Sequence, residues 1–73
     1  MPKNQMFSYK ELVIADHVSI KAAMEVLDRL GSQILIVVDK NNKLLGSLTD
    51  GDIRRGILKG IGLDQNVEKI VHR

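Results

Sequence analysis

The sequence contains no cysteine and no tryptophan, and it has only one tyrosine and one phenylalanine among its 73 residues. Without cysteine, neither a disulfide framework nor a thiolate metal site is possible. With so few aromatic rings, the chain has no platform on which the bases of a single-stranded nucleic acid would stack. A chain this short buries a lower fraction of its surface than a larger domain does, so its stability must come from aliphatic packing or from a partner.

Excess charge and long apolar runs are also missing. Eleven Lys and Arg stand against nine Asp and Glu, which gives a net charge of +2, and no basic run exceeds Arg54-Arg55. Such interspersed charges indicate a solvated surface rather than a nucleic-acid-binding face. The longest apolar run, Ile34 to Val38, is far shorter than the roughly 18 residues of a membrane helix. Because the N-terminal residues also lack the apolar core of a signal peptide, we expect a cytoplasmic protein without a nucleic-acid or membrane partner.

What the chain does have is a clear helical period followed by two short aliphatic runs. After Ser19, apolar residues recur at helical spacing as far as Leu30, and Gly31 then stands where a left-handed cap is needed. The β-branched run from Ile34 to Val38 predicts a buried strand. The polar residues 39–43 predict a hairpin turn, and residues 44–48 predict the returning strand.

These elements define an α/β fold in the order β-α-β-β-α, a small sheet packed by two helices. The first strand is expected near Leu12–Ile14. The second helix is expected to begin near Gly51 and end by Gly60, with four apolar side chains facing inward: Ile53, Ile57, Leu58 and Ile61. We expect residues 1–11 to be a flexible N-terminal segment and residues 12–62 to form one structural motif. In residues 63–73, Asn66 is expected to cap a short helix from Val67 to Val71.

Most candidate catalytic and metal-binding motifs lack a residue that their chemistry requires. The polar loop that starts at Asp39 faintly resembles a calcium loop, but Lys43 occupies a position where a ligand is needed. Asp52 stands where a P-loop needs its lysine, which reverses the charge of the phosphate clamp. Neither His17 nor His72 has a partner at a spacing that makes a triad or a metal pair. We therefore expect no catalytic residue, no metal site and no enzyme activity.

The segment from Thr49 to Asp52 admits two interpretations. In the structural one, Thr49 is the N-cap of the second helix and Asp52 is the third helical residue, which together form a capping box. An acid there also suits the positive end of the helix dipole. This interpretation needs no ligand.

In the functional interpretation, the same turn holds a nucleotide. The segment has a second acid, Asp50, and a glycine, Gly51, which costs helix stability while opening the backbone to close approach. The Asp52 carboxylate would accept the two ribose hydroxyls, and the Thr49 hydroxyl and free backbone amides would meet a phosphate. Arg54, or Arg55, would neutralise that phosphate.

About two-thirds of the chain, from Leu12 to Lys59, resembles one motif of the cystathionine-β-synthase (CBS) domain family, whose motifs bind nucleotides and work in pairs. The most specific matching stretch is Lys43-Leu44-Leu45-Gly46-Ser47-Leu48-Thr49-Asp50-Gly51-Asp52-Ile53-Arg54-Arg55. The resemblance implies that Thr49 is the phosphate-side hydroxyl and Asp52 the ribose-binding carboxylate. It further implies that Ile14, Ile34 and Ile36 flank an adenine.

The resemblance also implies a role and partners. It suggests a regulatory module with AMP, ADP or ATP as ligand and with no required cofactor. Residues 63–73 would lead toward a second CBS motif, and pairing would occur with that motif or in a homodimer. The form of the Thr49–Arg55 stretch is similar to that of CBS pairs attached to sugar-phosphate nucleotidyltransferases and isomerases, which suggests an attached or partner enzyme of sugar-nucleotide metabolism. The alternative is a structural dimerisation module that senses no ligand.

Overall fold

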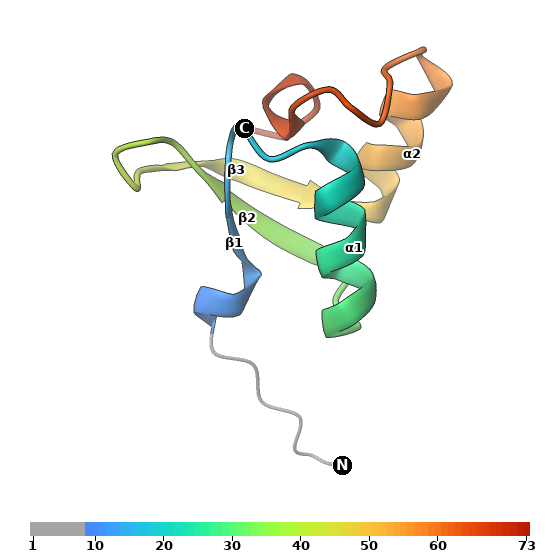
Figure 1. Cartoon of the computed structure of the whole chain (residues 1–73). Coiled ribbons are helices and arrows are strands. Elements are labelled where there is room, and N and C mark those ends of the chain that lie inside the picture. The colour runs from blue at the N-terminus through green and yellow to red at the C-terminus, as the bar shows by residue number, and fades with distance from the viewer. Residues whose placement is uncertain (1–8) are drawn as a thin grey trace.

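The computed structural model describes residues 9–73. Most of the segment predicted to be flexible, residues 1–8, lies outside the described residues. A short 3-10 helix, η1 (Tyr9–Leu12), leads into a three-stranded sheet formed by β1 (Val13–Ala15), β2 (Ile34–Val38) and β3 (Leu44–Thr49). The strand order is β1-β2-β3, with β1 parallel and β3 antiparallel to β2. Together with two α-helices this confirms the predicted β-α-β-β-α architecture (Figure 1).

Helix α1 (Ile20–Leu30) has the two ends that the sequence predicts. The Ser19 hydroxyl oxygen accepts a hydrogen bond from the backbone N–H of Ala22 at 3.0 Å, which satisfies one of the free donors of the first turn. Gly31 ends the helix with a φ of 66°, a left-handed conformation that suits glycine. The buried face of α1 consists of Ile20, Ala23 and Leu27.

One face of the sheet carries the hydrophobic core. Leu35, Val37 and Leu48 are fully buried beneath the two helices. The residues between them on β2 lie on the opposite face, and Ile34 there is 43% exposed. Side chains alternate between faces along a strand, so this small sheet has one covered side and one open, partly apolar side.

Helix α2 (Asp50–Leu58) buries less of its surface than the sequence predicts. Ile53 faces inward as expected, but Ile57 is 42% and Leu58 79% exposed, so the inward orientation predicted for these two is wrong. The reason is that Gly56, one turn after Ile53, forms the buried contact in their place. A side chain at Gly56 would meet Ile70 of the C-terminal segment, which packs directly on the helix backbone there.

The C-terminal segment, residues 63–73, packs as part of the core. The predicted helix from Val67 to Val71 is instead a 3-10 helix, η2 (Val67–Lys69), and Asn66 makes no side-chain cap hydrogen bond. Val67 is fully buried in the core cluster. Beyond it, His72 pairs with Ser47 at the outer edge of β3 through two backbone hydrogen bonds of 2.9 Å. The segment therefore extends the small core that the sheet and helices build.

Candidate functional site

The site begins where β3 ends and α2 starts. The Thr49 hydroxyl oxygen accepts a hydrogen bond from the backbone N–H of Asp52 at 3.1 Å. The Asp52 Oδ2 atom accepts in return from the backbone N–H of Thr49 at 2.9 Å and from its hydroxyl at 3.0 Å. This is a complete capping box, which satisfies two backbone donors reciprocally. The local fold alone thus explains why a hydroxyl and an acid stand three residues apart.

The second oxygen of Asp52 is also engaged. The Arg55 guanidinium lies 2.8 Å from Oδ1, one helical turn along α2, while the Asp52 side chain is only 12% exposed. Burial alone raises the pKa of Asp52, but hydrogen bonds from Thr49 and Arg55 and the Arg55 charge outweigh it, so the pKa lies below the ordinary value of 3.8. The carboxylate is therefore held ionised and oriented.

This pKa shift predicts a pH dependence of stability. A carboxyl whose pKa is lowered on folding stabilises the protein above its unfolded pKa, and the contribution is lost as pH falls through the folded pKa. We expect the free energy of unfolding, measured by urea denaturation, to drop below about pH 4. In the Asp52→Asn variant the part of this drop that belongs to Asp52 should be absent. An identical acid profile in the two proteins would contradict the prediction.

The apolar residues predicted to flank a base fall partly on this site. Ile34 is the register partner of Thr49, and Ile36 that of Ser47. Directly opposed residues of antiparallel strands point to the same face, so Ile34 lies beside Thr49 on the open side of the sheet. Val13 is the partner of Ile36 on the neighbouring strand, which extends the open apolar face.

Ile14 lies on the other face. It is 9% exposed within the core cluster, and its register partner is the fully buried Val37. Ile34 and Ile36 therefore share their face with Val13 and not with Ile14. In a strand of only three residues, the sequence pattern does not reveal which residue faces the core. The pairing of β1 with β2 reveals it, because side chains alternate between the two faces along β2.

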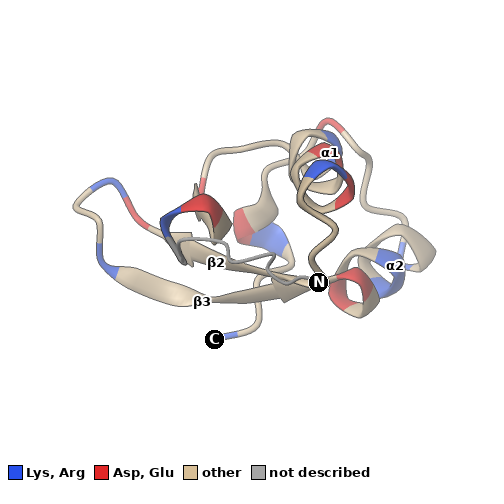
Figure 2. Cartoon of the chain, turned by 90° about the horizontal axis from the view of Figure 1, so that it is seen from below, with Lys and Arg blue, Asp and Glu red and all other residues tan. Residues whose placement is uncertain are grey.

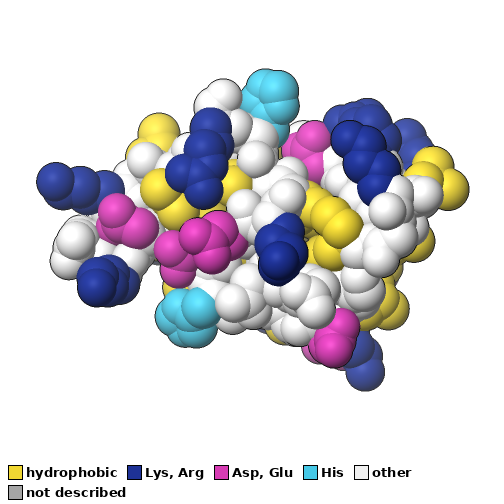
Figure 3. All heavy atoms as spheres, turned by 90° about the horizontal axis from the view of Figure 1, so that it is seen from above, with side chains coloured by type: hydrophobic (Ala, Val, Ile, Leu, Met, Phe, Trp, Pro, Cys, Tyr) yellow, Lys and Arg dark blue, Asp and Glu magenta, His cyan; other side chains and the backbone are white. Residues whose placement is uncertain are grey.

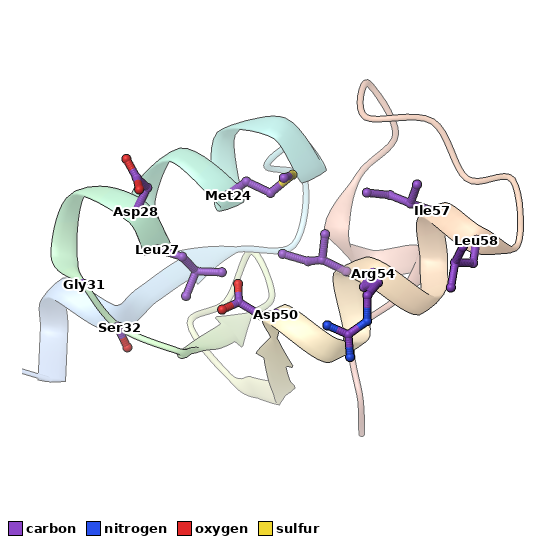
Figure 4. Close-up of a pocket in the computed structure, with 10 residues that line it drawn as sticks. Met24, Leu27, Asp28, Gly31, Ser32, Asp50, Arg54, Ile57 and Leu58 are labelled. Carbon is purple, nitrogen blue, oxygen red and sulfur yellow. The ribbon is translucent and has the colours of Figure 1, made fainter.

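Asp50 and Arg54, also predicted as ligand-binding, line a separate hollow of about 530 Å³ between the two helices. Figure 4 shows Met24 and Leu27 projecting from α1 toward α2, with Asp50 pointing into the same space. Gly51 lies between the two acids, and a side chain there would approach only the guanidinium of Arg55. The structure thus brings Thr49, Asp52 and Arg55 together and places Asp50 and Arg54 elsewhere.

Sequence reasoning named Arg55 only as an equal alternative to Arg54. Helical spacing separates them. Residues three apart are neighbours on a helix surface, whereas residues two apart, such as Asp52 and Arg54, are not. Asp52 and Arg55 have the first spacing. Across the described residues, no group of three or more His, Asp or Glu side chains could hold a metal ion. No helix among residues 9–73 is long and apolar enough to cross a bilayer.

Comparison with known proteins identifies the family. The CBS domain model matches residues 7–59, so the chain belongs to the CBS domain family. An uncharacterized protein of Helicobacter pylori strain J99 is 47% identical over 58 residues, which cover 77% of this chain and 17% of that protein. The arabinose 5-phosphate isomerase KdsD of Pseudomonas aeruginosa strain PAO1 is 38% identical over 47 residues, covering 64% of this chain and 14% of the isomerase. The chain spans less than a fifth of the length of these relatives.

Solved structures of the family share the fold. A CBS-domain-containing protein of Agrobacterium tumefaciens superposes with a TM-score of 0.78 at 22% identity, covering 84% of this chain and 47% of that protein. A CBS domain protein of Pyrobaculum aerophilum complexed with AMP superposes with a TM-score of 0.75 at 14% identity, covering 84% and 48%. In both, this chain corresponds to about half of the solved protein.

Proposed function

We propose that the chain is a regulatory module that binds an adenine nucleotide and has no catalytic activity of its own. The ribose hydroxyls lie at Asp52, the phosphate at the Thr49 hydroxyl, and the base against the open face of the sheet. The observation that carries this proposal is the register of β2 and β3, which sets the exposed Ile34 beside Thr49. An apolar surface next to a hydroxyl, a carboxylate and a guanidinium has the chemistry of a nucleotide: a flat base, two hydroxyls and an anion.

Pairing completes this site. The open face of the sheet presents Val13, Ile34 and Ile36 on one side of a three-stranded layer, and a monomer rarely leaves such a surface uncovered. A second CBS motif, or a second copy of the chain, covers it and supplies the other wall of the base pocket. The AMP complex of the P. aerophilum protein, which has about twice the length matched here, supports this arrangement.

The regulated enzyme is proposed from the relatives. The similarity to arabinose 5-phosphate isomerase KdsD supports an attached or partner enzyme that acts on a sugar phosphate, in the cytoplasm. A nucleotidyltransferase of sugar-nucleotide metabolism remains the second choice of partner. Binding regulates such an enzyme only to the extent that the nucleotide favours one arrangement of the paired motifs over another.

A titration of AMP, ADP and ATP against the melting temperature tests nucleotide binding. A nucleotide present at 100 times its dissociation constant should stabilise the folded protein by about 2.7 kcal/mol. Asp52→Ala should cost about 1 kcal/mol of stability through the lost cap and should also abolish the stabilisation by nucleotide. Ser19→Ala is the control, because it removes a capping hydrogen bond at the start of α1 and leaves α2 intact.

The outcomes separate two functions. If Ser19→Ala and Asp52→Ala lose similar stability and only Asp52→Ala loses the nucleotide effect, Asp52 contacts the ligand. If no nucleotide raises the melting temperature of the unaltered chain, sensing is wrong. The second candidate then stands: a structural dimerisation module, favoured because the capping box engages Oδ2 of Asp52 and Arg55 engages Oδ1.

A further inference from the structure

A second hollow, of about 230 Å³, lies between the last turns of α2 and the C-terminal segment. Its charged lining consists of Arg55 and Lys59 from α2, Lys69 from η2, and the Asp52 carboxylate. The space is several times the roughly 30 Å³ that one water molecule occupies in the liquid. A tetrahedral oxyanion therefore fits together with some of the water molecules that hydrate it. It is separate from the hollow between the helices, which none of these four residues lines.

The charges around this hollow do not cancel. Arg55 is engaged by Asp52 at 2.8 Å, whereas neither Lys59 nor Lys69 forms an ion pair with any residue in the described part of the chain. Two uncompensated ammonium groups from different elements therefore face one space. Figure 3 shows basic side chains spread over this face of the molecule, with several close together at the upper right of the view.

The walls strengthen the effect of these cations. Ile61, Ile70 and Val71 form the apolar part of the lining. With three cations against the one carboxylate of Asp52, the lining has a net positive charge, and a concave surface of this kind with walls of low dielectric constant focuses the field and raises the local concentration of counter-ions. The chain thus offers an anion a positive potential and up to three donors: two ammonium groups and the outer edge of a guanidinium.

Helix stabilisation does not account for this arrangement. Lys59 is the C-cap of α2 and offsets the negative end of that helix dipole. Lys69 lies in a 3-10 helix of three residues, which has too few peptide units to need a compensating cation. The tight packing of Ile70 on Gly56 holds the C-terminal segment against α2, and Lys69, the preceding residue, lines the same hollow.

From this geometry we infer that the hollow bounded by Arg55, Lys59 and Lys69 binds a phosphate-type anion. Each lysine donates to an anion oxygen, and Arg55 donates from the side of its guanidinium that Asp52 leaves open. The site does not depend on the proposed nucleotide site, although Asp52 and Arg55 border both. Its anion is either free phosphate or the phosphoryl group of a nucleotide.

Amide NMR of the full chain, titrated with inorganic phosphate at constant ionic strength, tests the inference. We expect saturable shifts at Gly56, Lys69 and Ile70. The double variant Lys59→Gln/Lys69→Gln should weaken phosphate binding by about tenfold or more, since each lost hydrogen bond to a charged group is costly. The control Lys21→Gln/Lys40→Gln removes the same charge from exposed positions elsewhere, and should change affinity by less than about twofold.

Parallel titrations with AMP and adenosine identify the source of the anion. Saturation by phosphate alone assigns the hollow to the free anion, and saturation by AMP but not by phosphate or adenosine assigns it to a nucleotide phosphoryl group. Three results would each overturn the inference. They are an equal loss of phosphate affinity in both double variants, amide shifts that do not saturate with phosphate or AMP, and amide shifts with adenosine as large as those with AMP. Binding of AMP elsewhere on the chain, with no shift at Gly56 from either AMP or phosphate, would leave the nucleotide proposal intact and reject this one.

Discussion

Replacing Leu48 by alanine should destabilise the fold more than any other single truncation proposed here. Leu48 is fully buried on β3, opposite the equally buried Leu35, under both helices. Large-to-small substitutions at such positions cost about 2–5 kcal/mol, because apolar contacts are lost and a cavity remains. Since domains of this size have little stability in reserve, a large part of the population should be unfolded at 25 °C. Urea denaturation followed by circular dichroism measures the loss.

Leu58→Ala is the matched control for that experiment. It makes the same chemical change on α2, where the side chain is 79% exposed. Surface substitutions of this kind usually change stability by no more than about 0.5 kcal/mol. If Leu58→Ala costs as much as Leu48→Ala, Leu58 is covered in solution by a partner, and the isolated chain is not the stable unit.

Gly46→Ala should break the contact between the sheet and the C-terminal segment. A Cβ at Gly46 would collide with the carbonyl group of His72, and backbone atoms cannot move aside as a flexible side chain can. The two hydrogen bonds between Ser47 and His72 would be lost with it. We expect a destabilisation of about 1–3 kcal/mol. Hydrogen exchange should show the His72 amide losing its protection before the amides of β2 do.

Gly51→Ala controls for the change of glycine to alanine itself. The new methyl group at Gly51 would approach only the Arg55 guanidinium, which is able to shift. Alanine is the better helix former, so this variant should gain up to about 1 kcal/mol. A Gly46→Ala variant as stable as the unaltered chain would show that residues 70–73 do not pack on β3.

Local chemistry explains which features the sequence predicts well. The ends of α1 follow from Ser19 and Gly31, because a cap depends on one residue and its nearest neighbours. The capping box at Thr49 and Asp52 is equally local. The element order also follows from hydrophobic periods, which are clear for α1 and for β2.

Features that depend on the packing of distant segments were harder to predict. Ile57 stays 42% exposed in the hollow between the helices, whereas Ile70, from the far end of the chain, covers Gly56. The face of β1 is set by pairing with β2, so the choice between Val13 and Ile14 needs the sheet register. The hollow around Lys59 and Lys69 joins two elements that no sequence motif links.

The distribution of surface charge over the described residues does not indicate a large binding surface for a charged macromolecule. Figure 2 shows acidic and basic residues distributed over the hairpin and both helices rather than gathered by sign on one whole side. The cationic hollow is therefore a local feature, suited to a small anion more than to a nucleic acid, which would need many phosphate contacts along an extended surface.

The burial of Val67 affects the order of events during synthesis. Backbone hydrogen bonds join Val67 to Val18 at 2.9 Å and Gln65 to Ile20 at 2.8 Å, so the start of α1 waits for partners more than forty residues downstream. Once residues 20–58 have emerged from the ribosome, the hairpin and both helices can form, but their shared interior stays open at one end. Closure comes only when Val67 has left the exit tunnel. Until then the nascent chain carries exposed aliphatic surface, the kind of surface that chaperones bind.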